Sequence, residues 1–575
     1  MLFASFDFLL FFLPVLGAWW ALRQRPWART AVVLAASYFF YMASSRPLDG
    51  SLPTPWYFAG LLAFSTVLDF VCSARIHRLA ARAEAGAASG GVARKRNLWL
   101  TASVVGNLSL LGYFKYTNFF LEAFTDMANG LGASWVAPHL ELMLPIGISF
   151  YTFQSLSYTI DVWRGKLTPE PSFLKFSFFV VFFPQLVAGP IVRASEFLPQ
   201  LHVRPRLTLE DVNEALFRIF KGLFKKVVLG DWLAVAFTDV VFDTPGSYTS
   251  WENMLALYGF TLQIYADFSG YSDIAIGVAR LLGFKIPENF DRPYQARNLG
   301  EFWRRWHMTL STWLRDYLFF PLGGSRGSAA RTYFNLWLTM FMVGMWHGAS
   351  WNFVIYSNIH GLAMLFNRWN RVRDKERGML VTLLQLTVLA ALVGITLYLL
   401  GVHVLALEHD LAVRGGALGG VFTWICAAFP VTGGRLNHVG HVVLTFHFTV
   451  LSRVFFRAET LESAREMCAQ VLRWDGRGVR PGLFKVQWME DWVVAATQSA
   501  TPLRETGVWV ADHAMLLLLV VGTFWHFTPR EWVDVRLRRR MLALPAPVIG
   551  IAYAALALVL MNLLTGPRAN IYFAF

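Results

Sequence analysis

Residues 342–353 read MVGMWHGASWNF, inside the apolar run TYFNLWLTMFMVGMWHGASWNFVIYSNIHGLAMLF at 332–366. A run of this length is sufficient to cross a bilayer. His347 lies near its middle, where an ionisable side chain is costly and by default indicates a functional site. The stretch therefore predicts a membrane-spanning fold with a histidine at membrane depth. A purely structural histidine, hydrogen-bonded to a neighbouring helix, remains the alternative.

The composition of the whole chain is that of a polytopic membrane protein. Its 575 residues are 55% hydrophobic and only 15% charged, whereas soluble globular proteins are about 25% charged. The net charge of +14 comes from basic residues in short loops beside apolar runs, so we expect no nucleic-acid partner. The three cysteines have no metal-ligand spacing and indicate neither a disulfide framework nor a redox role. We predict one all-α integral membrane domain over 1–575.

The charges of the loops predict the topology. The basic loop at 23–29 places the amino terminus outside, and the basic loop at 75–96 should be cytoplasmic. The loop at 121–141 contains acids but no Lys or Arg, so it should lie outside. The basic residues at 536–540 precede the last apolar segment and place the carboxyl terminus outside too. We expect about eleven transmembrane helices.

The alternation of loop charges fails after residue 192, because 193–231 is again rich in Arg and Lys. A re-entrant or broken segment at FFPQLVAGPIVR (182–193) would repair it, and 212–232 has the spacing of an interfacial amphipathic helix. Irregular backbone at membrane depth is tolerated only where protein or a water-filled cavity surrounds it. These segments should therefore line a central cavity. Residues 473–512, polar and rich in Trp, are expected to form an extramembrane insertion.

Polar residues are dense at 261–326. Asp267 and Asp273 interrupt a run that would otherwise span, and a structural hydrogen-bonding or ion-pairing role is their alternative. The part at 285–326 holds seven basic and four acidic residues, a net charge of +3, with His307 among them. The arginines fit a cytoplasmic loop, and they also fit an anion-binding mouth for phosphate groups. Both interpretations can hold together.

Familiar catalytic motifs are missing. GYSDI at 270–274 lacks the second glycine of a nucleophile elbow, and the chain has no H-E-x-x-H and no Walker loop. His307 and His347 are 40 residues apart and not at the i, i+4 spacing of a local pair of metal ligands. We therefore predict no metal site. Two histidines beside an arginine-rich loop suit general-base chemistry on a hydroxyl group.

Five long stretches then resemble the membrane-bound O-acyltransferase (MBOAT) family, in particular its bacterial branch that acetylates alginate or moves D-alanine towards teichoic acids. They are LPIGISFYTFQSLSYTIDVWRG (144–165), FFPQLVAGPIVR (182–193), YADFSGYSDIAIGVARLLGF (265–284), NFDRPYQARNLGEFWRRWHMTLSTWLRDYLFFPLGG (289–324) and MVGMWHGASWNF (342–353). The motif-dense catalytic core is therefore about 140–366.

The resemblance implies a bundle of about eleven helices around a central funnel or tunnel, and acyl transfer from a thioester to a hydroxyl. The family's catalytic histidine falls on His347 and its second histidine on His307. No tightly bound cofactor is expected, and the donor would be acetyl-CoA or a carrier-protein thioester. The weaker candidates for substrate contacts are Arg304, Arg305, Arg315, Trp346, Ser350, Asn352, Asp267 and Tyr271.

The most favoured function is transfer of an acetyl group from a cytoplasmic thioester to a cell-envelope or secreted polysaccharide, in the cell membrane, which is the inner membrane if the cell is Gram-negative. Expected partners are the lipid bilayer, an extracytoplasmic acetyltransferase and an acyl carrier protein. Acylation of a lipid, a protein or a teichoic-acid-type acceptor is an alternative. A transporter or channel for glycan precursors is the other, although the sequence has no inverted repeat.

Overall fold

The structure is a computed structural model that describes residues 3–44, 57–84, 90–373, 379–428, 435–474, 476–480, 482–485, 487–496 and 502–563. Within these ranges the regular structure is helical and contains no strand, which confirms the all-α prediction. The first helices are α1 (Phe6–Ala21), α2 (Pro26–Ser44), α3 (Tyr57–Glu84), α4 (Gly90–Gly130), α5 (Ile148–Trp163), α6 (Phe173–Val181), α7 (Phe183–Leu186), α8 (Ala194–Leu201), α9 (Leu209–Phe224) and α10 (Asp239–Asp243).

The central and later helices follow. They are α11 (Ser250–Leu281), α12 (Leu299–Arg305), α13 (Met308–Leu314), α14 (Ala329–His347), α15 (Trp351–Arg373), α16 (Met379–Leu399), α17 (His409–Ala428), α18 (Arg435–Arg457), α19 (Leu461–Arg473), α20 (Gln487–Ala496), α21 (Pro502–Asp512), α22 (Ala514–Phe527), α23 (Arg538–Leu542) and α24 (Ala546–Leu563). Three π-helical segments adjoin these helices. Segment η1 (Lys225–Trp232) continues α9, η5 (Arg315–Phe319) continues α13, and η7 (Glu531–Leu537) precedes α23.

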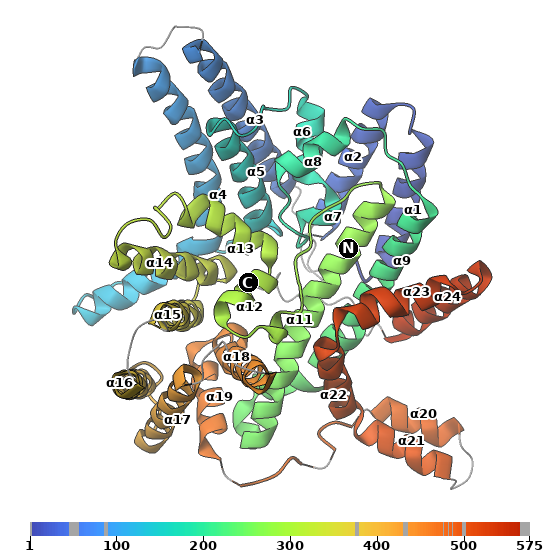
Figure 1. Cartoon of the computed structure of the whole chain (residues 1–575). Helices are drawn as coiled ribbons and strands as arrows, with labels where there is room; N and C mark the ends of the chain where they lie inside the picture. Colours follow the sequence, from blue (N-terminus) through green and yellow to red (C-terminus); the bar gives the residue numbers. More distant parts are fainter. Residues whose placement is uncertain are drawn as a thin grey trace.

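Helix α11 runs through the middle of the molecule (Figure 1). A capping box starts it, in which the Thr249 hydroxyl accepts from the Glu252 backbone N–H and the Glu252 carboxylate accepts from the Thr249 N–H. Gly283, in the left-handed region at φ 84°, follows its end. Most of its 32 residues are buried on every face, because α9, α18, α19 and α22 pack around it. The polar side chains of α11 are therefore presented to the protein interior.

The chain is irregular at 182–193, as the sequence predicts. Helix α6 ends at Val181, α7 is a single turn, and the residues that follow up to Val192 are buried in protein. Gly147, at the start of α5, packs so closely against this segment that a Cβ there would lie 2.5 Å from the Leu186 carbonyl oxygen. The segment thus lies inside the bundle, where irregular backbone is tolerated.

The basic side chains of α9 do not project outwards as a purely interfacial helix would require. Arg218 and Lys221 of α9, and Lys225 at the start of η1, all form ion pairs with Asp273 of α11. The basic residues that disturb the alternation of loop charges are thus partly neutralised inside the protein. Apolar and basic residues at helical spacing serve here to pack α9 on α11.

Three helices within the described residues are long and apolar enough to cross a membrane, judged by length and composition. They lie at Tyr57–Glu84, Thr387–Val404 and Asn437–Arg457. A fourth is possible if Glu505–Asp512 and Ala514–Phe527, bent by 71°, form one span. The count of about eleven stays a prediction. The prediction of about eleven crossings is also incompatible with the prediction that both termini lie outside. An odd number of crossings places the termini on opposite faces of the membrane.

Residues 473–512, predicted to be extramembrane, contain α20 and α21, which pack on each other at the edge of the molecule (Figure 1). Their position relative to a membrane stays a prediction. The bent pair described above includes 505–512.

Candidate active site

His347 is the last residue of α14 and is 2% exposed. The helix ends there because Gly348, in extended backbone, leaves the helical conformation, and its N–H caps the Gly344 carbonyl. Aromatic rings surround the imidazole: the ring centroid of Phe456 lies 5.1 Å away and that of Trp346 lies 5.0 Å away. The imidazole is therefore held at a helix end, in an apolar environment.

His307 is fully buried at the start of α13. Its backbone adopts the left-handed region at φ 44°, which is costly for a residue with a bulky side chain and is found at functional sites. The Asn289 carboxamide oxygen lies 3.0 Å from the Nδ1 atom of His307 and accepts a hydrogen bond from it. This bond fixes the Nδ1–H tautomer and leaves the Nε2 atom as the acceptor.

Trp346 lies between the two histidines. Its ring centroid is 5.4 Å from that of His307, in an edge-to-face arrangement, and it adjoins His347 in sequence. Phe150 packs against both Trp346 and His307, at centroid distances of 5.3 and 6.2 Å. The fold thus brings the two predicted histidines and Trp346 into one aromatic cluster, although His307 at the start of α13 and His347 at the end of α14 are 40 residues apart in the sequence.

A hollow open to solvent is lined by His347 and Trp346; its empty space, counting the part that is open solvent, is about 450 Å³, and we call it the histidine cavity. The segment 144–150 supplies most of its wall, and that wall is mainly apolar. Lys115 of α4 is its other ionisable lining residue. An acceptor hydroxyl inside this cavity would be in reach of the imidazole of His347.

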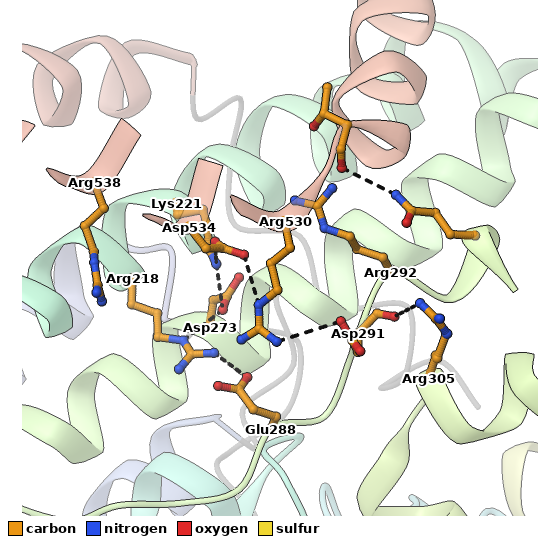
Figure 2. A network of polar contacts seen from close by, with 12 residues as sticks. Arg218, Lys221, Asp273, Glu288, Asp291, Arg292, Arg305, Arg530, Asp534 and Arg538 are labelled. Atoms are coloured by element: carbon orange, nitrogen blue, oxygen red, sulfur yellow. Dashed lines mark hydrogen bonds and ion pairs between the residues drawn. The ribbon is translucent and has the colours of Figure 1, made fainter. Parts of the chain in front are cut away.

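A second hollow, also open to solvent, lies between α9, α11, the 288–292 segment and the carboxyl-terminal helices; its empty space, counting the part that is open solvent, is about 810 Å³, and we call it the charged cavity. Five basic side chains line it, namely Arg218, Lys221, Lys225, Arg292 and Arg530. Four acidic side chains line it too, namely Asp273, Glu288, Asp291 and Asp534. Figure 2 shows most of these groups converging from α9, α11, the 288–292 segment and η7.

Most bases of the charged cavity are paired with acids. The Asp273 carboxylate accepts from Arg218 Nε at 3.0 Å and from Lys225 Nζ at 2.8 Å, and Lys221 Nζ donates to Asp534 at 3.0 Å. Arg530 bridges Asp291 and Asp534 less closely, at 4.0 and 3.6 Å.

Arg292 differs from these bases. Its guanidinium donates to the His526 carbonyl at 3.4 Å and, within the described part of the chain, forms no ion pair with a carboxylate. Its backbone is left-handed at φ 47°, as at His307. Of the basic groups that line the charged cavity, Arg292 is therefore the one whose charge is most available to bind an anion.

His307 lies between residues that line the two cavities. Asn289 lines the charged cavity and holds the Nδ1 atom of His307, while Phe150 and Trp346, which contact the same imidazole, line the histidine cavity. A donor in the charged cavity and an acceptor in the histidine cavity would approach each other through this aromatic cluster.

The three arginines predicted to contact a donor line neither cavity. Arg304 is exposed, and Arg315 pairs with its neighbour Asp316 at 2.9 Å. Arg305 donates to Glu301 at 2.7 Å. Burial raises the pKa of Glu301, but hydrogen bonds from Arg297 and Arg305 outweigh it and lower that pKa, so the carboxylate is ionised and neutralises Arg305.

The remaining predicted contacts are also placed by the structure. Asp267 forms a buried ion pair with Lys226, which fits the structural alternative, and Tyr271 packs against Phe3. Asn352 donates to the Ala458 carbonyl at 2.8 Å, and the Ser350 carbonyl accepts the first hydrogen bonds of α15. Of the eight weaker candidates, Trp346 alone is among the residues described as lining a cavity.

Two residues of the site were missed from the sequence. Asn289 orients His307, and Lys115 donates to the carbonyls of Trp346 and His347. Lys115 was detectable, because an isolated lysine in the apolar stretch LGYFKYTNFF (111–120) is itself an ionisable group at membrane depth. Asn289 carried no such signal. Within the described residues no group of three His, Cys, Asp or Glu is arranged to hold a metal ion.

Comparison with known proteins gives the family. Residues 164–373 match the sequence profile of the MBOAT, membrane-bound O-acyltransferase family. The chain is 40% identical over 378 residues to "Probable alginate O-acetylase AlgI" of Azotobacter vinelandii, covering 65% of this chain and 70% of the relative. It is 33% identical over 549 residues to the protein of the same name from Pseudomonas syringae pv. tomato, covering 91% and 97%. It is 37% identical over 336 residues to "Peptidoglycan O-acetyltransferase" of Helicobacter pylori, covering 54% and 60%.

The matched region 164–373 contains both His307 and His347, and the similarity to the Pseudomonas syringae protein extends over nearly the whole chain. The resemblance inferred from the sequence motifs is thereby confirmed. This chain belongs to the membrane-bound O-acyltransferase family, and it is an acyltransferase.

Proposed function

We propose that this protein moves an acyl group, most simply acetyl, from a thioester donor to hydroxyl groups of a cell-envelope or secreted polysaccharide. One observation carries the proposal: His347 lines a solvent-open cavity and is joined, through Trp346 and His307, to a second cavity lined by many charges. The relatives are named for acetylation of alginate and of peptidoglycan, which supports a polysaccharide acceptor.

Charge placement supports the direction of transfer. The charged cavity is built from segments dense in Arg and Lys, including 285–326 and the 530–540 region, and such segments favour the cytoplasm. The histidine cavity is built from 144–150, next to the 121–141 loop, which has no Lys or Arg. The donor would therefore enter from the cytoplasm and the acceptor from outside, in the inner membrane of a Gram-negative cell.

The chemistry requires one base and one leaving group. The acceptor hydroxyl gives its proton to the neutral imidazole of His347 as its oxygen attacks the thioester carbonyl carbon. The C–O bond forms, the C–S bond breaks, and the thiolate takes the proton from the imidazolium. His307, fixed by Asn289, presents its Nε2 atom beside Trp346 and lines the route along which the thioester approaches.

The donor would be acetyl-CoA or a carrier-protein thioester, with no cofactor tightly bound. Phosphate groups, which both donors carry, are attracted to cationic side chains such as Arg292. A separate extracytoplasmic acetyltransferase would complete the transfer where the polysaccharide itself does not reach the histidine cavity.

The His347→Ala variant tests this function. We expect a folded, membrane-inserted protein whose transfer rate, with donor and acceptor supplied, falls by about 10²–10⁴-fold, the usual contribution of a general base. His441→Ala is the matched control, because His441 is also buried but lines neither cavity. Near-normal transfer by purified His347→Ala protein would show that His347 is structural and would remove the proposed base.

A further inference from the structure

The end of α14 is held by two neighbouring residues of α4. A helix leaves its last four carbonyl groups without partners inside the helix. Here Gly348 N–H caps Gly344, the Tyr116 hydroxyl donates to the Met345 carbonyl at 2.8 Å, and Lys115 Nζ donates to both following carbonyls. Three of the four carbonyls, including that of His347, are therefore satisfied from a helix more than 200 residues away in the sequence.

The type of residue suits this place for two reasons. The carboxyl-terminal end of a helix carries partial negative charge, so an ammonium group there is favourable. An ammonium group also has three N–H donors, and two of them serve the carbonyls of Trp346 and His347, the second at 3.2 Å. One donor is left for a group in the histidine cavity, which Lys115 lines.

The other residues that line the histidine cavity determine what this third N–H group of Lys115 can bind. Apart from the two ionisable groups, Lys115 and His347, the histidine cavity is lined by uncharged residues, mostly apolar, and Ser149 is its one hydroxyl side chain. In such surroundings an isolated ammonium group is disfavoured, but it acts more strongly on an anion than it would in water, so a carboxylate in the cavity would hold Lys115 in its charged form. The backbone contact to His347 places this charge next to the proposed base.

From this geometry we propose that Lys115 has two tasks: it positions His347 through the carbonyls at the end of α14, and it selects an acceptor that carries a carboxylate. The second task rests on the proposed function. A sugar carboxylate bound to the ammonium group would place a hydroxyl of the same polymer towards the imidazole. The preferred acceptor is therefore an anionic polysaccharide rather than a neutral one.

The experiment compares two acceptor oligosaccharides of equal length, an oligouronate and its carboxyl-reduced, neutral counterpart. Lys115→Gln keeps an N–H donor near the carbonyls but removes the charge. We expect the KM for the oligouronate to rise about tenfold, in line with the loss of a charge-assisted hydrogen bond, and the KM for the neutral acceptor to change less than about twofold. Lys115→Arg should retain the preference for the oligouronate.

Tyr116→Phe is the matched control, because it removes the neighbouring hydrogen bond to the Met345 carbonyl and leaves the charge in place. It should lower kcat with both acceptors equally and leave the KM ratio unchanged. Lys115→Met should lower kcat with both acceptors and also abolish the preference. An unchanged KM ratio in Lys115→Gln would overturn the selecting role, and an unchanged kcat in Lys115→Met would overturn the positioning role.

Failure of the proposed function is distinguishable from failure of this inference. If the wild-type protein acylates neither oligosaccharide, direct transfer to a polysaccharide fails. Equilibrium binding of the same two oligosaccharides without donor then decides the role of Lys115. Binding of the oligouronate that is weakened in Lys115→Gln supports it, and equal affinity of wild type and variant contradicts it.

Discussion

The charged cavity and the histidine cavity differ in almost every physical respect. The first holds five basic and four acidic side chains on helices α9 and α11, the 288–292 segment and the carboxyl-terminal region. The second is smaller and mainly apolar, with Lys115 and His347 as its ionisable groups. Under the proposed function, the difference would separate the binding of a large, charged donor from the chemistry, because a base and a developing oxyanion interact more strongly where few charges and little water compete.

The region between the two cavities is built mainly from one kind of side chain, unlike the cavity walls. It consists of aromatic rings around His307, whose imidazole is oriented by the hydrogen bond from Nδ1 to Asn289. Asn289 also accepts from the Thr309 hydroxyl at 2.9 Å, so it joins the start of α13 to the 289–291 segment. Apart from the proposed base His347 itself, disturbing this connection should affect turnover more than disturbing the other residues that line the cavities.

The largest effect we predict here is for Asn289→Ala. Without the carboxamide oxygen the buried Nδ1–H of His307 loses its acceptor, which costs about 1–3 kcal/mol. We expect kcat to fall about 10–100-fold, by the same relation, with little change in the KM for either substrate. Asn289→Asp keeps an accepting oxygen and should restore most of the rate. Steady-state kinetics on purified protein measures both.

Asn335→Ala is the control for general destabilisation. Asn335 is buried and donates to the Leu322 and Gly324 carbonyls, but it lines neither cavity. It should lower thermal stability and leave kcat nearly unchanged. Equal losses of kcat in the two alanine variants would mean that Asn289 acts only through the fold.

A smaller effect is expected in the wall of the charged cavity. Arg292→Gln removes the basic group that has no carboxylate partner in the described part of the chain. The KM for the donor should rise about tenfold, while the KM for the acceptor stays the same, and added salt should weaken donor binding less than in wild type. Initial rates over a range of donor concentrations, at two ionic strengths, measure this.

Arg304→Ala serves as its control, because Arg304 is exposed and lies outside both cavities. Its donor KM should change less than about twofold, as is usual for exposed charges. A larger effect at Arg304 than at Arg292 would favour the arginines first predicted from the sequence and would contradict the assignment of the charged cavity to the donor.

The sequence allowed a feature to be predicted where its residues differ in chemistry or backbone preference from their neighbours in the sequence. His347 interrupts an apolar run, His307 lies in an arginine-rich one, and the buried irregular segment at 182–193 follows from its prolines and glycine and from the failed alternation of charge. Each of these features can be recognised from a few neighbouring residues. The structure then brings the two histidines into one cluster.

The sequence was uninformative where a contact joins distant segments. Lys115 meets the end of α14 across 231 residues, and Asp273 pairs with bases of α9 about 50 residues earlier. Which arginines face the charged cavity depends on such contacts, so Arg304, Arg305 and Arg315 could not be distinguished from Arg292 by charge alone. The number of spans is equally hard to count, because α11 is buried by other helices and carries too many polar side chains to register as apolar.

The central claim is that the two cavities open to opposite faces of the membrane. Cysteine labelling tests it directly, in a variant whose three native cysteines, Cys72, Cys426 and Cys468, are replaced. Ile146→Cys places a thiol in the histidine cavity and Val533→Cys places one in the charged cavity, and both native side chains are half-buried. A membrane-impermeant maleimide is applied to right-side-out and to inverted vesicles.

The account predicts that Ile146→Cys reacts in right-side-out vesicles and Val533→Cys reacts in inverted vesicles, and that acyl donor protects the second thiol but not the first. Reaction of both thiols from the same face, or the reverse pattern, would contradict the account.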